Sequence, residues 1–234
     1  MNYILKKSTY GKYVLIIYKD NAISDISNNY ERDYEDESAQ RSKRTVLDIA
    51  LNNDFDWFVT FTFHTKGKLV EDRKDFQSIK KKFLKAINNY NRVYDTQIKY
   101  IAVPELHKNK MGIHFHCLMS GLDTLKDFKF AGFDSKKGYT IFVSDFFKKR
   151  FGANRGIRIK NYNEFVAFYT SKYITKTDDR IFYRRYFRSI NLNRSEVLAR
   201  GSVANVHNLI PSFENGLLSI YQLDTIVGLE YLLN

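Results

Sequence analysis

With 44% hydrophobic and 16% aromatic residues, the 234-residue chain can bury one substantial core. Its 38 lysines and arginines against 26 aspartates and glutamates give a net charge of +12, which favours nucleic acid as a partner and, as an alternative, an anionic membrane surface. No apolar run approaches the length of a transmembrane helix, the start lacks a secretory signal and the single cysteine excludes an internal disulfide, so we expect a cytoplasmic protein.

The first segment is expected to be a hairpin followed by a charged linker. Residues 2–18 contain two apolar runs on either side of a polar turn near Gly11. Residues 19–44 are polar, with an acidic cluster followed by basic residues, as in a solvated loop. We therefore set residues 1–45 apart as an N-terminal hairpin and linker, and we expect a short helix over residues 46–51.

A strand and a long helix are predicted next. Residues 58–63 alternate apolar side chains with Thr60 and Thr62, which is the period of a half-buried strand. Hydroxyls on a sheet can contact a phosphodiester, but threonine is also an ordinary strand residue, so a mostly structural role is favoured. Apolar residues then recur at spacings of three and four over residues 71–91, which predicts an amphipathic helix.

The middle of the chain predicts more strands than helices. Residues 99–105 and 113–119 read as two strands that pair through a turn at residues 108–112. A glycine-containing connection is expected to lead into a helix over residues 142–150, and residues 156–160 predict a short strand.

The last predicted helix covers residues 163–176, and the apolar tail is expected to pack back on the main domain. Strands that alternate with helices in short units predict an α+β fold, in which a sheet carries helices on one face. We therefore divide the chain into the N-terminal segment, a main domain over residues 46–200 and a C-terminal tail over residues 201–234.

Two histidines in the predicted strand are the strongest sign of chemistry. His114 and His116 are two residues apart, so both imidazoles project from one face. Glu105 lies beside them if the two strands pair, and this trio supplies three ligands with open positions, as a catalytic metal requires. The mixed donors suit Mn²⁺ or Mg²⁺ with a substrate phosphate, and zinc stays open. A surface pair without function is the alternative, and His107 is a rival ligand that reads as a loop residue.

A second pattern lies in the last predicted helix. Tyr169 and Tyr173 are one turn apart, and Lys172 and Lys176 each follow a tyrosine by three, so all four share a face. A tyrosine hydroxyl is a poor nucleophile unless its conjugate base is stabilised, which ammonium groups and a metal on the attacked phosphate both provide. Aromatic pairs at this spacing usually belong to a core, but lysine does not, so packing explains the repeat less easily.

In this order, residues 58–63, Glu105 with residues 114–116, and residues 169–176 resemble the three motifs of rolling-circle replication initiators. These initiators belong to the HUH endonuclease superfamily, in which U is a bulky hydrophobic residue. Two tyrosines four residues apart, with lysines in phase, resemble the two-tyrosine branch of phage-type Rep proteins. The resemblance covers about residues 55–190.

The resemblance implies a central antiparallel sheet with helices on one face, similar to an RNA-recognition or ferredoxin-like domain. It implies that His114, His116 and Glu105 hold Mg²⁺ or Mn²⁺ against the scissile phosphate of single-stranded or locally melted origin DNA. Tyr169 or Tyr173 would attack the phosphorus, leaving a 5′-phosphotyrosine and a 3′-hydroxyl that primes synthesis. The second tyrosine would then cleave the regenerated origin so that the displaced strand can be circularised.

The same resemblance assigns Lys172 and Lys176 to countering charge on the phosphate or lowering the tyrosine pKa. The sequence contains no P-loop, so a separate helicase and a host DNA polymerase are expected partners in a bacterial or phage-infected cell. A transposase or relaxase with the same chemistry stays open as an alternative. A non-catalytic, basic nucleic-acid-binding domain with an RNA-recognition-like sheet is the alternative from a different class.

Overall fold

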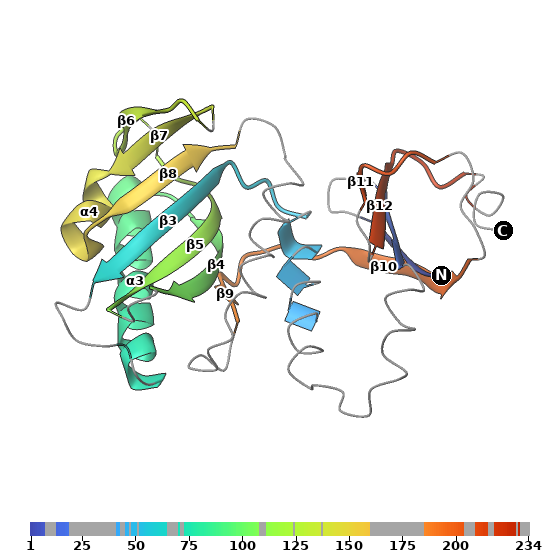
Figure 1. The fold of residues 1–234 in the computed structure, drawn as a ribbon, viewed down its shortest axis with the longest axis horizontal. Helices are drawn as coiled ribbons and strands as arrows, with labels where there is room; N and C mark the ends of the chain where they lie inside the picture. Colours follow the sequence, from blue (N-terminus) through green and yellow to red (C-terminus); the bar gives the residue numbers. More distant parts are fainter. Residues whose placement is uncertain are drawn as a thin grey trace. The chain divides into compact units, whose positions relative to one another are not determined.

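The computed structural model describes residues 1–7, 13–18, 41–42, 45–46, 48–50, 52–64, 70, 73–107, 111–123, 125–136, 138–159, 185–203, 209–214, 218–227 and 229. The chain divides into two compact units. The first comprises residues 1–38, 51–53 and 193–234, and the second comprises residues 39–50 and 54–192. Each unit is built on one antiparallel sheet (Figure 1).

The first unit contains a five-stranded sheet in the order β10-β1-β2-β12-β11. Its strands are β1 (Asn2–Lys7), β2 (Tyr13–Tyr18), β10 (Glu196–Ser202), β11 (Phe213–Glu214) and β12 (Leu218–Leu223). The predicted hairpin is confirmed, because β1 and β2 pair antiparallel along their whole length. Leu15 and Ile17 of β2 are buried at its centre, together with Tyr221 of β12.

This division differs from the boundaries expected at residues 45 and 200. The apolar tail, expected to pack on the main domain, contributes the buried residues Ile220 and Tyr221 to the sheet of the first unit. β12 pairs with the edge of β2 that the hairpin leaves open, so the backbone groups of that edge find partners. Hydropathy indicates that the tail is buried, but it does not indicate which strand covers it.

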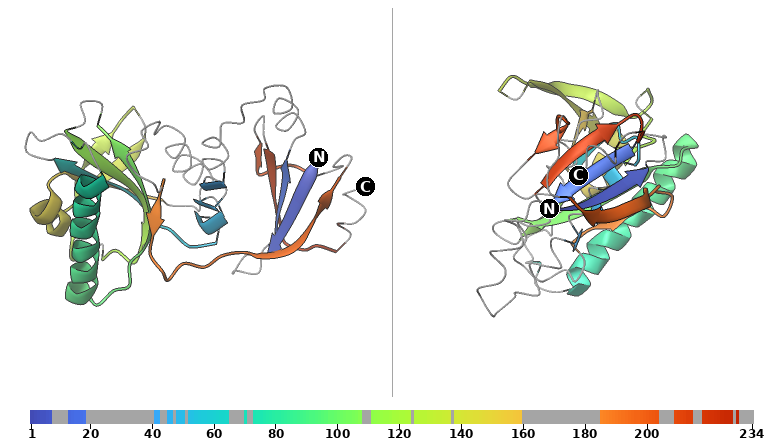
Figure 2. Two further views of the ribbon diagram at one scale, coloured as in Figure 1. Left: turned by 90° about the horizontal axis from the view of Figure 1, so that it is seen from below. Right: turned by 90° about the vertical axis from the view of Figure 1, so that its right-hand side faces the viewer.

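The second unit contains a seven-stranded sheet in the order β6-β7-β8-β3-β5-β4-β9. Its elements are β3 (Trp57–His64), α3 (Arg73–Tyr94), β4 (Lys99–Leu106), β5 (Gly112–Ser120), β6 (Phe128–Asp134), β7 (Tyr139–Ser144), α4 (Asp145–Phe151), β8 (Asn154–Arg158) and β9 (Phe187–Arg188). α3 and α4 lie on one face of this sheet (Figures 1 and 2). The predicted α+β class, with an antiparallel sheet and helices on one face, is confirmed.

Most of the predicted elements are present, with one correction between β5 and β8. The expected helix over residues 142–150 begins only at Asp145, and the expected connection before it contains the strand pair β6 and β7. Ser144 sets the start of the helix, because its hydroxyl accepts a hydrogen bond from the N–H of Phe147 at 3.0 Å. Gly132 signals a loop in the sequence, but in the structure it follows the bulge in β6.

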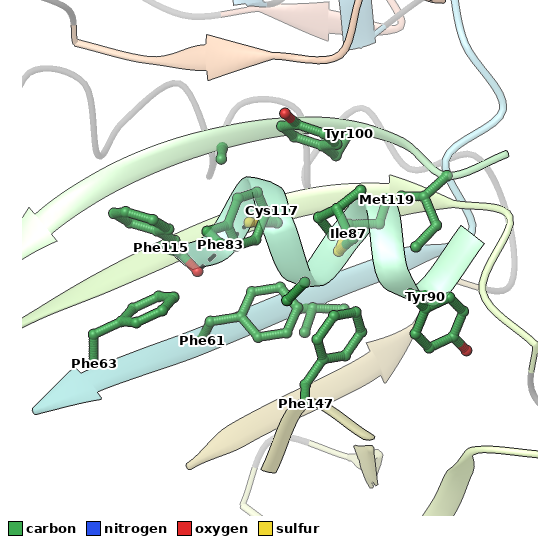
Figure 3. Close-up of a cluster of buried hydrophobic side chains, with 14 of the residues drawn as sticks. Phe61, Phe63, Phe83, Ile87, Tyr90, Tyr100, Phe115, Cys117, Met119 and Phe147 are labelled. Carbon is green, nitrogen blue, oxygen red and sulfur yellow. Dashed lines mark hydrogen bonds between the residues drawn. The ribbon is translucent and has the colours of Figure 1, made fainter. Parts of the chain in front are cut away.

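The core of the second unit is aromatic and lies between the sheet and the two helices. The ring of Phe83 in α3 packs edge-on against Phe61 of β3 and Phe115 of β5, with centroids 5.5 and 5.4 Å apart. Tyr90 of α3 stacks on Phe147 of α4 at 5.0 Å. Figure 3 shows these rings converging from both helices and both strands. The central strands are therefore held on one side by interlocking rings.

The predicted long helix is confirmed as α3, whose apolar residues Phe76, Ile79, Phe83, Ile87 and Tyr90 are all buried. Its other side carries many lysines, and no helix among the described residues is long and apolar enough to cross a membrane. In the predicted short helix, residues 45–46 and 48–50 are helical and are drawn on the side of the sheet away from α3 (Figure 2). The predicted helix over residues 163–176 lies outside the described residues.

Candidate functional site

Three neighbouring strands bring the predicted ligands to one face of the sheet. His114 and His116 of β5 lie opposite Thr62 and Thr60 of β3, and Glu105 of β4 lies opposite His114. Side chains alternate along a strand, so these five project from the same face. It is the face away from α3, since the residues between them belong to the aromatic core. We call it the site face.

The two threonines hold the two imidazoles. The Thr60 hydroxyl oxygen is 3.2 Å from Nδ1 of His116, and the Thr62 hydroxyl oxygen is 3.0 Å from Nδ1 of His114. A hydroxyl both donates and accepts, so it can hold either tautomer of the ring. The sequence alone favours a mostly structural role for these threonines, whereas in the structure they orient the histidines.

Glu105 reaches diagonally to His116 rather than straight across to His114. Its Oε2 is 2.7 Å from Nε2 of His116, the distance of a strong hydrogen bond from an imidazole N–H to a carboxylate. His116 is buried and Glu105 is half-buried, so bulk water screens this contact only partly. The two rings of β5 lie 5.8 Å apart, centroid to centroid. The structure thus brings together Glu105, His114 and His116.

The donor set fits a hard or borderline divalent ion in type. Within the described part of the chain, no three His, Cys, Asp or Glu side chains already form a group arranged to hold a metal ion. Glu105 bonds directly to His116 instead. An ion bound at right angles by these two atoms, with bonds of about 2.1 Å, separates them by roughly 3 Å. The present contact of 2.7 Å needs to widen by only a few tenths of an ångström.

His107 lies at the edge of the same cluster. It directly follows β4, and its ring centroid is 4.0 Å from that of His114. Gly112 makes this approach possible, because a Cβ on residue 112 would lie 2.8 Å from the His107 ring and 2.7 Å from the carbonyl oxygen of Phe63. The sequence favours a loop residue, whereas in the structure the ring of His107 packs against that of His114.

Arg155 of β8 lies beside the site face, opposite Thr60. Its guanidinium donates to the carboxylate of Asp134 at 2.9 Å and to the hydroxyl of Tyr139 at 3.2 Å. The sequence carries no signal for this position, because it depends on β8 pairing with β3. A cation is therefore held two strands from His116.

Cys117 follows the second histidine but faces the core. It is fully buried, and burial raises the pKa of its thiol well above the ordinary value. The thiol therefore stays protonated and takes no part in the site.

The predicted nucleophiles Tyr169 and Tyr173, with Lys172 and Lys176, lie outside the described residues. The segment that carries them joins β8 to β9 along the chain. In the order of the sheet these two strands stand on either side of β3, β5 and β4.

Comparison with known families gives one match. A family model for replication-associated proteins of the ORF2 type matches residues 56–178, just over half of the chain. The match runs from the start of β3 past both predicted tyrosines and includes every residue of the histidine cluster. No part of the first unit falls within it. No curated protein and no solved structure matches the chain.

Proposed function

Because the chain belongs to this family of replication-associated proteins and so acts in replication, we propose that its second unit is a metal-dependent nickase of the HUH type. It cuts one strand of a replication origin, remains joined to the DNA through a 5′-phosphotyrosine and later rejoins the strand ends in rolling-circle replication. One observation carries the proposal: Glu105, His114 and His116 meet on one sheet face, and threonines hold both imidazoles.

In this proposal His114, His116 and Glu105 hold one Mn²⁺ or Mg²⁺. When bound, the ion polarises the scissile phosphate and stabilises the charge that develops on its oxygens. Coordination requires the lone pair of an imidazole Nε2, so Nδ1 must then carry the proton. Thr60 and Thr62 can accept that proton as hydrogen-bond partners, so they favour the tautomer that binds metal.

Tyr169 or Tyr173 supplies the nucleophile. Its oxygen loses a proton to solvent and bonds to phosphorus while the bond from phosphorus to the 3′-oxygen breaks. The 3′-oxygen takes up a proton, so the charges balance and a primer end is formed. Lys172 and Lys176 stabilise the phenolate. Rejoining is the same step in reverse, with a 3′-hydroxyl as the attacking group and the tyrosine as the leaving group.

Two observations support this nucleophile. The family match extends over both tyrosines, and the segment that contains them joins the strands on either side of β3, β5 and β4. The net charge of +12 suits a single-stranded or locally melted origin as substrate. A separate helicase and a host DNA polymerase complete the proposed reaction in the cytoplasm of a bacterial or phage-infected cell.

The proposal is tested with purified protein, Mn²⁺ and labelled single-stranded oligonucleotides that tile the replicon. We expect a covalent protein–DNA adduct on a denaturing gel, dependent on the metal, with the modified peptide mapped by mass spectrometry to Tyr169 or Tyr173. The Tyr169→Phe/Tyr173→Phe variant should form none. An adduct that persists in this variant refutes the tyrosine assignment. DNA binding with steep salt dependence but no adduct with either metal would favour a non-catalytic binding domain.

A further inference from the structure

The solvent side of α3 carries a row of hydrogen-bond donors. Its exposed members are Lys74, Ser78, Lys81, Lys85, Asn88 and Arg92. Alternating spacings of four and three keep them in one line along the helix, opposite the buried apolar stripe. At about 1.5 Å per residue, the row is about 27 Å long.

The row is strongly and one-sidedly charged. From Lys74 to its end, α3 has six basic residues and one acidic residue, and α4 has three basic and one acidic. Together they carry a net charge of +7, more than half of the chain's +12. Like charges at the spacing of Lys81 and Lys85 destabilise a helix, so these positions gain from a bound anion. No described residue forms an ion pair with any of the cations Lys81, Lys82, Lys85 and Arg92.

α4 continues this surface. Phe146 and Phe147 of α4 both pack against Tyr90 of α3, with ring centroids 5.1 and 5.0 Å apart, so the two helices are neighbours. Lys148 and Lys149 of α4 are exposed. We call the exposed cations of the two helices the basic layer: Lys74, Lys81, Lys82, Lys85, Arg92, Lys148 and Lys149. It covers the face of the sheet opposite the site face (Figures 1 and 2).

We propose that the basic layer binds the phosphate backbone of double-stranded DNA beside the origin, while the site face holds the strand to be cut. This inference rests on the proposed function. The exposed side chains favour a duplex over a single strand, because single-strand binding relies on aromatic rings that stack on bases. No aromatic residue of α3 is exposed, whereas lysine, arginine, serine and asparagine are ordinary phosphate contacts. A row of about 27 Å spans about eight phosphates of one strand.

The test compares two variants that lose the same charge. Lys81→Gln/Lys85→Gln/Arg92→Gln removes cations from the basic layer, and Lys7→Gln/Lys126→Gln/Lys136→Gln removes exposed cations outside it. Binding to a random-sequence duplex of about 20 base pairs is followed by fluorescence anisotropy over a range of salt concentrations. We expect the first variant to bind at least about tenfold more weakly and its salt slope to fall by about 2 to 3. The control variant should change affinity less than about threefold.

Three further outcomes decide the partner. An equal loss in both variants would reduce the effect to net charge and overturn the proposal. An equal loss for a single strand of the same length would overturn the assignment to a duplex, and an equal loss for a poly-glutamate peptide would indicate an acidic protein instead. Thermal unfolding by circular dichroism should show the same midpoint for all forms, since lysine, arginine and glutamine have similar helix propensities.

The outcome is separable from the nickase proposal. The basic-layer variant should still form the tyrosine adduct with a short single-stranded origin. If neither wild type nor variant forms an adduct, the proposed function fails while the duplex measurement still stands. If the variant loses the adduct on the short strand as well, the basic layer serves the cleavage reaction itself and the duplex proposal is overturned.

Discussion

Strands β3 and β5 show two different surfaces in alternate residues. On the core face, Phe61 and Phe115 are fully buried against α3. On the site face, Thr62 and His114 are half-buried and contact one another. Neighbours in sequence thus serve packing and chemistry separately. The difference indicates how the site is held: its side chains project from strands that an interlocked aromatic layer immobilises from behind.

The largest effect should come from removing a core ring. Phe115 contacts the rings of Phe63, Phe83 and Phe187, with centroids 4.8 to 5.4 Å apart. Phe115→Ala should lower the free energy of unfolding by about 3–5 kcal/mol, through lost burial and the cavity it leaves. Urea denaturation measures this, with Phe115→Leu as a milder control. A loss below about 1 kcal/mol would contradict the view that this layer supports the site.

The next residue toward the N-terminus should behave in the opposite way. His114→Ala should reduce adduct formation at least about 100-fold, which equals about 2.7 kcal/mol of transition-state stabilisation. The free energy of unfolding should change by less than about 1 kcal/mol, because the side chain is half-buried. Single-turnover adduct formation and urea denaturation are compared on the same preparation. If stability falls as far as in Phe115→Ala, His114 is a structural residue and the contrast between the faces disappears.

A smaller loss is expected when the contact behind an imidazole is removed. Thr62→Val keeps the branched shape of the strand residue but deletes the hydroxyl that contacts His114. The Mn²⁺ concentration for half-maximal adduct formation should rise about 10- to 100-fold, as for other partners that orient metal ligands. Thr62→Ser restores the hydroxyl and should recover most of the affinity. Equal behaviour of the valine and serine variants would show that the hydroxyl does not orient the ring.

Arg155 should give the smallest effect. Its ion pair with Asp134 is 43% and 21% exposed on the two side chains, so water screens it. Arg155→Gln should lower the free energy of unfolding by less than about 1 kcal/mol. Adduct formation should fall less than about tenfold by the same single-turnover measurement. A larger loss of activity at unchanged stability would extend the site across β8.

Local pattern in the sequence predicts much of this arrangement. Alternation at residues 58–63 and the spacing of apolar residues in α3 each reflect burial of one face, so strand and helix follow from the sequence. Pairing between distant strands does not. The contact of Thr62 with His114, and the diagonal bond from Glu105 to His116, depend on register across β3, β5 and β4. No local pattern encodes that register.

The first unit shows the same division. Apolar runs predict the β1–β2 hairpin, because its two strands are adjacent in the chain. The partner of the C-terminal strand is not predictable in this way, since Ile220 lies far from Ile16 in sequence yet opposite to it in the sheet. An apolar segment is buried wherever an open strand edge and a complementary face are present.

The most direct test of the site face is the coordination of Mn²⁺ by pulsed electron paramagnetic resonance. We expect one ion per chain with nitrogen couplings from two imidazoles. One coupling should disappear in His114→Ala, and both should disappear in His114→Ala/His116→Ala. Folded protein that binds no Mn²⁺, or nitrogen couplings that persist in the double variant, would contradict a metal site at His114 and His116.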